Sequence, residues 1–187
     1  MAEGFLDTRR FGFVAALESA WIEIRRECLS LPSDSFEPWV QREMYGDGWG
    51  VYGLIAFGER IEAALRACPQ TASVLHRVPG LTTAGFSRMA PGTHIKPHTG
   101  WVRTVYRLHL GLVVPTGCAL RVGTETRQWR EGESLIFDDT VEHEAWNRSG
   151  ESRTVLLLDF LRPGMSNPNN DVPPPEVQAM IRSRMRR

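Results

Sequence analysis

The feature that most constrains this fold is a two-residue hydrophobic period that begins after Gly80. Over residues 104–115, TVYRLHLGLVVP, successive side chains alternate between two faces, as they do in a long β-strand. Arg107 and His109 share one face, and the other face is apolar. A strand that is covered on both sides carries apolar residues on each. The pattern therefore indicates either a polar cavity inside a β-structure or a face that is exposed to solvent.

Further strands follow along the chain and predict a mainly β domain with flanking helices. An early strand is predicted at residues 51–57, VYGLIAF. After Gly80, the predicted elements are a strand that ends near Met89, a hairpin over 118–130 with its turn at Gly123–Thr124, and strands at 132–139, 144–147 and 153–160.

The N-terminal part reads as helical. Residues 13–29 place Leu17, Trp21, Ile24 and Cys28 on one apolar face, which predicts a helix packed on the outside of the sheet. A second helical pattern runs from Arg60 to Arg77 and is interrupted at Pro69, which favours a new helix that opens at this proline. We therefore expect one domain over 1–187, with helices at 13–78 packed on a core of about 80–163 and a C-terminal tail at 164–187. In the tail, NPNNDVPPP favours an extended segment, and a short basic helix starts at Pro174 or Pro175 and is solvated or touches an acidic partner.

The composition excludes several classes of partner. The 187 residues carry 22 basic and 22 acidic side chains, so no global charge favours nucleic acid or an anionic membrane. The three cysteines are odd in number and widely spaced, which argues against a disulfide framework and fits a reducing compartment. The sequence shows no signal peptide and no apolar run long enough to span a membrane. The expected location is the cytoplasm, without a membrane or nucleic-acid partner.

Two histidines and an arginine stand out in the β-rich region. His98 and His143 are 45 residues apart, and Arg153 follows His143 by ten. Imidazoles hold Fe(II) in oxygen-activating non-haem iron enzymes, and a buried cation can anchor a carboxylate co-substrate. Arg153 begins an otherwise apolar strand, where an unpaired charge would be costly without an anion. On spacing alone, ordinary loop or core histidines remain an equal alternative.

The local sequence decides between these alternatives. HTG, RLHLGLV, GCALR, ETRQWREGESLIFDD, EHEAW and SRTVLLLDF occur in this order between Phe86 and Pro163. Together they closely resemble the catalytic domain of the aspartyl/asparaginyl β-hydroxylase family, with weaker similarity upstream from about Trp49. The resemblance implies a double-stranded β-helix (jelly-roll, cupin-like) barrel. It also implies Fe(II), 2-oxoglutarate and O₂ as cofactor and co-substrates.

The resemblance also implies site residues. His98 and His143 would hold the metal, and Gly100 stands where a carboxylate ligand is usual, so water would fill that position. The alternative is that Asp138, Asp139 or Glu142 serves as a ligand, but the Asp pair better suits hydrogen bonds that orient the imidazole. Arg153, helped by Ser87, would clamp the far carboxylate of 2-oxoglutarate. Arg107 and His109 would meet its C1 carboxylate or the substrate's acid group.

Other residues near these motifs have less defined roles. His94 matches the family pattern and would position the metal loop, and Trp146 is expected to pack under the site. Candidates for substrate contact are Trp49, which lies either in the core or at the mouth of a cleft, Arg103 and Val105.

The sequence is compatible with several classes of substrate. Animal aspartyl hydroxylases have an arginine where this chain has Val105, and they carry helical repeats that are absent here. We therefore expect hydroxylation of an amino-acid residue or an amino-acid-like small molecule, free, peptidyl or carrier-bound. Free proline and a lipid acyl chain are alternatives, as is a metal-binding cupin that senses or binds a ligand without turnover. Arg153 argues against this last alternative, because a sensor has no need of a buried cation ten residues after its second histidine.

Overall fold

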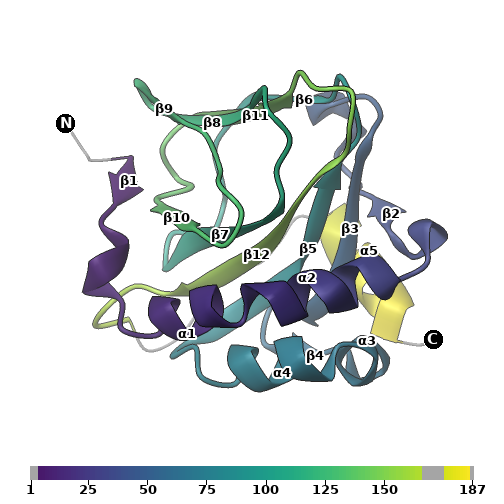
Figure 1. Cartoon of the computed structure of the whole chain (residues 1–187), viewed down its shortest axis with the longest axis vertical. Coiled ribbons are helices and arrows are strands. Elements are labelled where there is room, and N and C mark those ends of the chain that lie inside the picture. Colours follow the sequence, from purple (N-terminus) through teal and green to yellow (C-terminus); the bar gives the residue numbers. More distant parts are fainter. Residues whose placement is uncertain (1–3, 166–174, 186–187) are drawn as a thin grey trace.

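The computed structural model describes residues 4–165 and 175–185. Two antiparallel sheets face each other, and helices cover the outer side of the larger one (Figure 1). The larger sheet contains, in spatial order, β1 (Phe5–Leu6), β10 (Ser134–Phe137), β7 (Val105–Val113), β12 (Arg153–Leu161), β5 (Leu81–Met89), β3 (Trp49–Ala56) and β2 (Glu37–Pro38), with β4 (Glu59–Arg60) paired to β3. The smaller sheet contains β6 (His94–His98), β11 (His143–Asn147), β8 (Cys118–Val122) and β9 (Glu125–Arg127).

The order of the strands defines the fold. From β6 to β12 the chain passes back and forth between the two sheets, with β6, β8, β9 and β11 in the smaller one and β7, β10 and β12 in the larger one. This winding is a double-stranded β-helix, so the cupin-like barrel is confirmed. The predicted hairpin also forms, since β8 and β9 pair with Val122 opposite Glu125.

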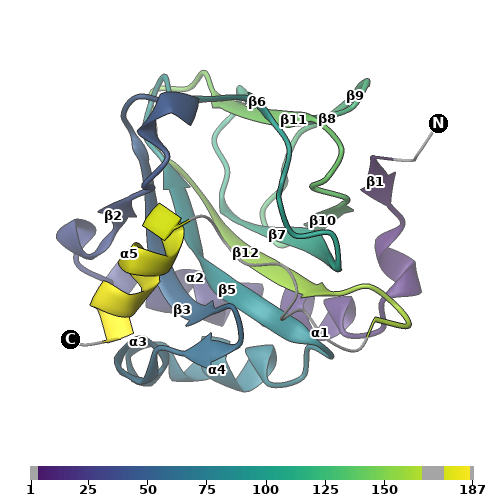
Figure 2. The same ribbon diagram turned by 180° about the vertical axis from the view of Figure 1, so that it is seen from behind.

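Helices pack against the side of the larger sheet that faces away from the barrel, as Figure 2 also shows from behind. They are α1 (Val14–Ser19), α2 (Trp21–Ser30), α3 (Glu62–Ala67) and α4 (Pro69–Leu75). The last helix, α5 (Pro175–Met185), lies on the opposite side of this sheet, in front of β3 in Figure 2. The 3₁₀ turns are η1 (Thr8–Arg10), η2 (Ser33–Ser35) and η3 (Arg42–Met44). The single helix predicted over 13–29 is two helices, because the backbone leaves helical geometry at Ala20 (ψ 3°). Pro69 opens α4 as predicted, since the first turn of a helix tolerates a residue without an amide proton.

Strand alternation separates two cores. On β7 and β12, Leu108, Leu110 and Leu156 are fully buried against the helices. The alternate residues, among them His109 and Arg153, point to the barrel interior and are also buried. The two faces of β7 therefore differ as the sequence pattern indicated, and the polar face lines an interior rather than the solvent.

The N-terminal region contributes strands as well as helices. The strand predicted at 51–57 is β3, which pairs with β5 and widens the larger sheet beyond the expected core of 80–163. The extended segment predicted around 166–174 lies outside the described residues, and the predicted terminal helix is α5. In the described part of the chain, no helix is long and apolar enough to cross a membrane.

Candidate active site

Two histidines lie opposite each other where β6 ends and β11 begins. His98 and His143 are register partners, and their ring centroids are 4.2 Å apart. The register between the two strands shifts between His143 and Ala145, and such an irregularity redirects the side chains beside it. The sheet thus brings together the two imidazoles that are 45 residues apart in the sequence.

Each imidazole is fixed by a carbonyl group of its own segment. Nδ1 of His98 lies 2.8 Å from the carbonyl oxygen of Lys96, and Nδ1 of His143 lies 2.9 Å from that of Val141. A carbonyl oxygen only accepts hydrogen bonds, so both Nδ1 atoms carry a proton and donate it. In the neutral rings, both Nε2 atoms therefore keep a free lone pair, which is the form that binds a metal.

Burial favours the neutral form of both rings. It lowers the pKa of His98 and lowers the pKa of His143 to about 3, where the neighbouring His98 adds to the effect. No group of three or more His, Cys, Asp or Glu side chains in residues 4–165 and 175–185 is arranged to hold a metal. Two neutral imidazoles at this separation fit a divalent cation such as Fe(II).

The space beside Gly100 is filled by the carboxylate of Asp139. A Cβ atom on Gly100 would lie 2.2 Å from Oδ2 of Asp139, and the Gly100 amide donates to the Asp139 carbonyl oxygen at 2.6 Å. Asp139 is 1% exposed, and its Oδ1 has no hydrogen-bond partner among the described residues. A side chain at position 100 and the carboxylate of Asp139 therefore exclude each other.

Arg107 is already held by carboxylates. Its Nε and Nη2 atoms donate to the two oxygens of Asp159 at 2.7 and 2.8 Å, and Nη2 lies 3.3 Å from Oδ2 of Asp139. Burial alone would lower the pKa of Arg107, but Asp159 and Asp139 raise it above its usual value. The protein itself thus neutralises this guanidinium.

Arg153, in contrast to Arg107, has no carboxylate partner among the described residues. It is 1% exposed, Nη1 donates to the carbonyl oxygen of Ser87 at 3.1 Å, and Nη2 contacts the sulfur of Met89. The guanidinium carbon lies 4.4 Å from the ring centroid of Trp129, and Nε has no partner in the described residues. Burial lowers the pKa of Arg153 to about 10. A buried cation without a carboxylate partner in the described chain is costly unless it receives an anion.

Other polar groups near Arg153 also lack partners. His109 is 7% exposed, and neither ring nitrogen has a hydrogen-bond partner in the part of the chain described here. Burial, with help from Arg153, lowers the pKa of His109 well below its usual value. The ring of Phe137 packs against both His109 (5.1 Å) and His143 (5.4 Å), which places this region beside the histidine pair. We call the buried group of Ser87, His109, Trp129 and Arg153 the deep polar cluster.

A cleft opens beside His98, and we call it the outer cleft. Its volume is about 120 Å³. Its polar end contains His98, Arg107, Asp139 and Asp159. Its wall is mostly apolar and includes Trp39, Trp49, Val51, Trp101, Leu157 and Val177. Trp49 also donates from Nε1 to the Ser87 hydroxyl at 3.0 Å, so it links the cleft to the deep polar cluster.

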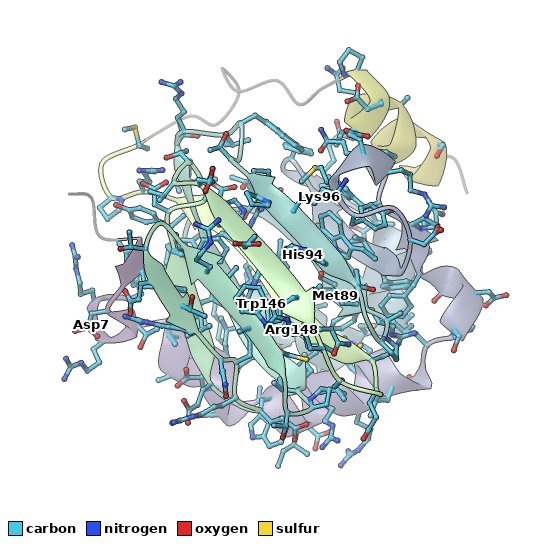
Figure 3. The ribbon with its side chains drawn as sticks, turned by 90° about the horizontal axis from the view of Figure 1, so that it is seen from above. Asp7, Met89, His94, Lys96, Trp146 and Arg148 are labelled. Atoms are coloured by element: carbon cyan, nitrogen blue, oxygen red, sulfur yellow. The ribbon has the colours of Figure 1, made fainter. Side chains whose placement is uncertain are left out.

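Two expectations about neighbouring residues are wrong. Asp138 does not orient an imidazole, because it accepts from Arg162 and from Thr140, and the backbone carbonyls hold the rings instead. Trp146 does not pack under the site. It lies on the outer face of the smaller sheet, where the guanidinium carbon of Arg148 is 4.8 Å from its ring centroid (Figure 3).

Three other candidates lie away from the outer cleft. His94 is on the outer face of the smaller sheet, with Nε2 2.7 Å from Oε2 of Glu144 (Figure 3). Val105 is fully buried and does not line the cleft. Arg103 lines a separate polar pocket of about 430 Å³ that shares only Gly100 with the cleft.

Asp159 is the functional candidate that sequence reasoning missed. It shares the inward face of its strand with Arg153, in a run of apolar residues. Strand alternation, which singled out Arg107 and His109 on β7, also places Asp159 on the inward face of β12.

The facing sheets define a cupin-like barrel in which two imidazoles lie close together. Residues 18–163 match the sequence profile of aspartyl/asparaginyl beta-hydroxylase. Since this profile covers most of the chain, the protein belongs to the aspartyl/asparaginyl β-hydroxylase family.

The names of the related proteins indicate different substrates. The chain is 38% identical over 168 residues to the ornithine lipid ester-linked acyl 2-hydroxylase of Rhizobium tropici, which covers 84% of this chain and 60% of that protein. It is 36% identical over 162 residues to human aspartyl/asparaginyl beta-hydroxylase, covering 82% and 21% respectively. Among solved structures, a predicted oxalate decarboxylase from Thermotoga maritima aligns with a TM-score of 0.48 and 11% identity, over 71% of this chain and 98% of that one. The chain thus spans less than two thirds of these curated relatives.

Replacing Asp139 by asparagine should stabilise the metal-free protein at pH 7.5. Burial raises the pKa of Asp139 to about 6, whereas an unfolded aspartate titrates near pH 4. Between these values the folded state holds a proton that the unfolded state has lost, so the contribution of Asp139 to stability falls as pH rises. Urea unfolding at several pH values should show Asp139→Asn more stable than wild type at pH 7.5, with the difference vanishing near pH 4. A difference that is the same at both pH values would contradict this assignment.

Proposed function

We propose that the chain is an Fe(II)- and 2-oxoglutarate-dependent dioxygenase that hydroxylates an amino-acid residue or an amino-acid-like molecule. The observation that carries the proposal is Arg153, a buried guanidinium without a carboxylate partner in the described chain, which belongs to a polar cluster near two neutral imidazoles. Bound together, Fe(II), 2-oxoglutarate and O₂ would place one oxygen atom in a substrate C–H bond and the other in succinate, with release of CO₂.

One set of residues would bind the metal, and another would bind the co-substrate. Nε2 of His98 and of His143 would bind Fe(II), because both Nδ1 atoms are occupied by backbone carbonyls. Arg153 would bind the distant carboxylate of 2-oxoglutarate through a charge-assisted pair, with the Ser87 hydroxyl nearby. His109, whose ring nitrogens have no partners in the described chain, is available as a donor to a carboxylate at the metal end.

Arg107 and Asp139 have a positioning role in this proposal. Asp139 fills the space beside Gly100, and Arg107 holds Asp139 and Asp159 together across the mouth of the centre. A water molecule at the metal position that Gly100 leaves without a ligand would therefore lie next to a carboxylate. The apolar wall of the outer cleft would exclude further solvent from the reacting C–H bond.

Two alternatives are distinguished by specific observations. A cupin that only binds a metal does not account for Arg153, a buried cation that has no carboxylate partner among residues 4–165 and 175–185. An acyl chain as the substrate is favoured by the similarity to the Rhizobium tropici acyl hydroxylase and by the apolar wall of the outer cleft.

The test of the proposal is the conversion of 2-oxoglutarate. Purified protein with Fe(II) and O₂ should form succinate from 2-oxoglutarate, slowly even without substrate. Arg153→Met and His143→Ala should form none, whereas His94→Ala, on the outer face of the smaller sheet, should match wild type. An iron-loaded wild-type protein that forms no succinate would overturn the proposal.

A further inference from the structure

The outer cleft and the deep polar cluster differ in charge. The deep polar cluster contains Arg153, a cation that lacks a carboxylate partner in the described chain and suits the dicarboxylate co-substrate. The outer cleft is lined by one guanidinium, Arg107, and by two carboxylates, Asp139 and Asp159, both of which contact it. Apart from the histidine, no other charged side chain among the described residues lines this cleft. An acid group on a substrate would therefore meet excess negative charge there.

The remaining wall of the outer cleft is suited to an alkyl chain. Val51, Gly53 and Ile55 follow one another along β3, and β3 lies beside β5 in the larger sheet. Leu157 of β12 adds an inward-facing apolar side chain that is only partly buried, and Val177 of α5 closes the far end. From Val51 to Ile55 the strand rises about 13 Å, which is the length of an extended chain rather than of a single amino-acid side chain.

Three tryptophan rings form part of the wall of the outer cleft. Trp39 and Trp101 are stacked with 11° between their planes and 6.5 Å between centroids, and Trp39 lies 5.4 Å from Trp49. All three rings line the outer cleft. Flat apolar surfaces of this kind contact methylene groups and do not require a charged group on the ligand.

We propose that the outer cleft binds a long uncharged acyl chain along Val51, Leu157 and Val177, with its reactive carbon toward His98, and that Asp139 and Asp159 exclude acidic substrates. This inference rests on the proposed Fe(II)- and 2-oxoglutarate-dependent hydroxylation, and it replaces the amino-acid substrate with the acyl chain that was given as its alternative. The same chemistry is present in an acyl ester of a lipid and in an acyl thioester on a carrier.

The first experiment measures binding without turnover. Protein loaded with Mn(II) and 2-oxoglutarate is titrated with neutral methyl esters of saturated acids that carry a terminal bromine, which quenches nearby tryptophans. Affinity should rise by up to about fourfold for each added methylene, and then level off when the cleft is full. An affinity that does not depend on chain length would overturn the proposal.

The second experiment uses a matched pair of variants in the cleft. Leu157→Gln introduces a polar group of similar size and should weaken binding of the esters at least tenfold, whereas Leu157→Met should bind like wild type. Melting temperatures and uncoupled succinate formation report whether both variants keep their fold and metal centre. Equal affinity of the Gln and Met variants would show that the chain does not lie along Leu157.

The third experiment tests selection by charge. An aspartyl peptide should fail to displace the brominated ester from wild type, and Asp159→Asn should improve the peptide's affinity by removing one carboxylate. Efficient displacement by the peptide from wild type would contradict the proposal.

The last experiment follows hydroxylation with Fe(II) and separates the two sources of acyl chain. An acyl lipid in zwitterionic vesicles and an acyl-pantetheine thioester are each examined for a mass gain of one oxygen. Either product supports the acyl class and identifies its source, whereas protein that forms succinate but oxidises neither substrate overturns the acyl assignment. Failure of the proposed function would appear differently, as ester binding without any succinate.

Discussion

Replacing either His98 or His143 by alanine should weaken Mn(II) or Fe(II) binding by about 100-fold or more. Loss of a residue that merely supports a metal ligand can cost that much, and loss of a ligand should cost at least as much. Each Nε2 atom has a free lone pair because its Nδ1 atom donates to a backbone carbonyl. Titration of the metal-free variants, followed by calorimetry, provides the measurement.

Matched controls come from the outer surface. His94→Ala removes a histidine bound to Glu144, and Glu142→Gln removes a carboxylate that pairs with Arg121. Both variants should bind metal like wild type. Asp139→Asn is the decisive case, since Asp139 fills the space beside Gly100. If it lost the metal as completely as the histidine variants, the centre would contain a carboxylate ligand and the two-histidine assignment would fail.

Replacing Arg153 by methionine should weaken 2-oxoglutarate binding by about 30-fold to several thousand-fold. Truncating one partner of a buried, hydrogen-bonded charge pair costs about 2–5 kcal/mol, which gives this range. Lysine at this position should restore only part of the affinity, because it lacks the planar fork of the guanidinium. Calorimetric titration of 2-oxoglutarate into the Mn(II)-loaded variants measures both effects.

The same substitution should not destabilise the ligand-free protein. Arg153 is buried without a carboxylate partner in the described chain, and replacing such a charge by an apolar side chain of similar length is neutral or stabilising. A melting temperature at or above that of wild type, together with lost 2-oxoglutarate binding, separates a binding role from a structural one. Normal 2-oxoglutarate affinity in Arg153→Met would refute the assignment.

The alternation of side chains was enough to predict the core of the fold. Arg107 and His109 on one face of β7, with leucines on the other, already indicated a polar interior. The reason is local, because successive residues of a strand point to opposite faces wherever the strand lies. The break between α1 and α2 at Ala20 was not predictable in this way, since the apolar period continues through it.

The partners of the charged residues were decided only by the tertiary structure. The sequence singled out Arg107 and Arg153 as similar interior cations, but the sheet register places Asp159 opposite Arg107 and Met89 opposite Arg153. Strand pairing joins residues 52 positions apart in the chain, and no local pattern specifies it.

The sequence alone was enough to identify the candidate metal ligands. It did not indicate which side chains fill the space around them. HTG and EHEAW identified His98 and His143, and Gly100 showed where a side chain is missing. That Asp139 fills this gap depends on the close approach of two loops, in which the Gly100 amide donates to the Asp139 carbonyl. Local spacing determines which residues can bind a metal, and long-range packing determines the charge and shape that a substrate meets beside it.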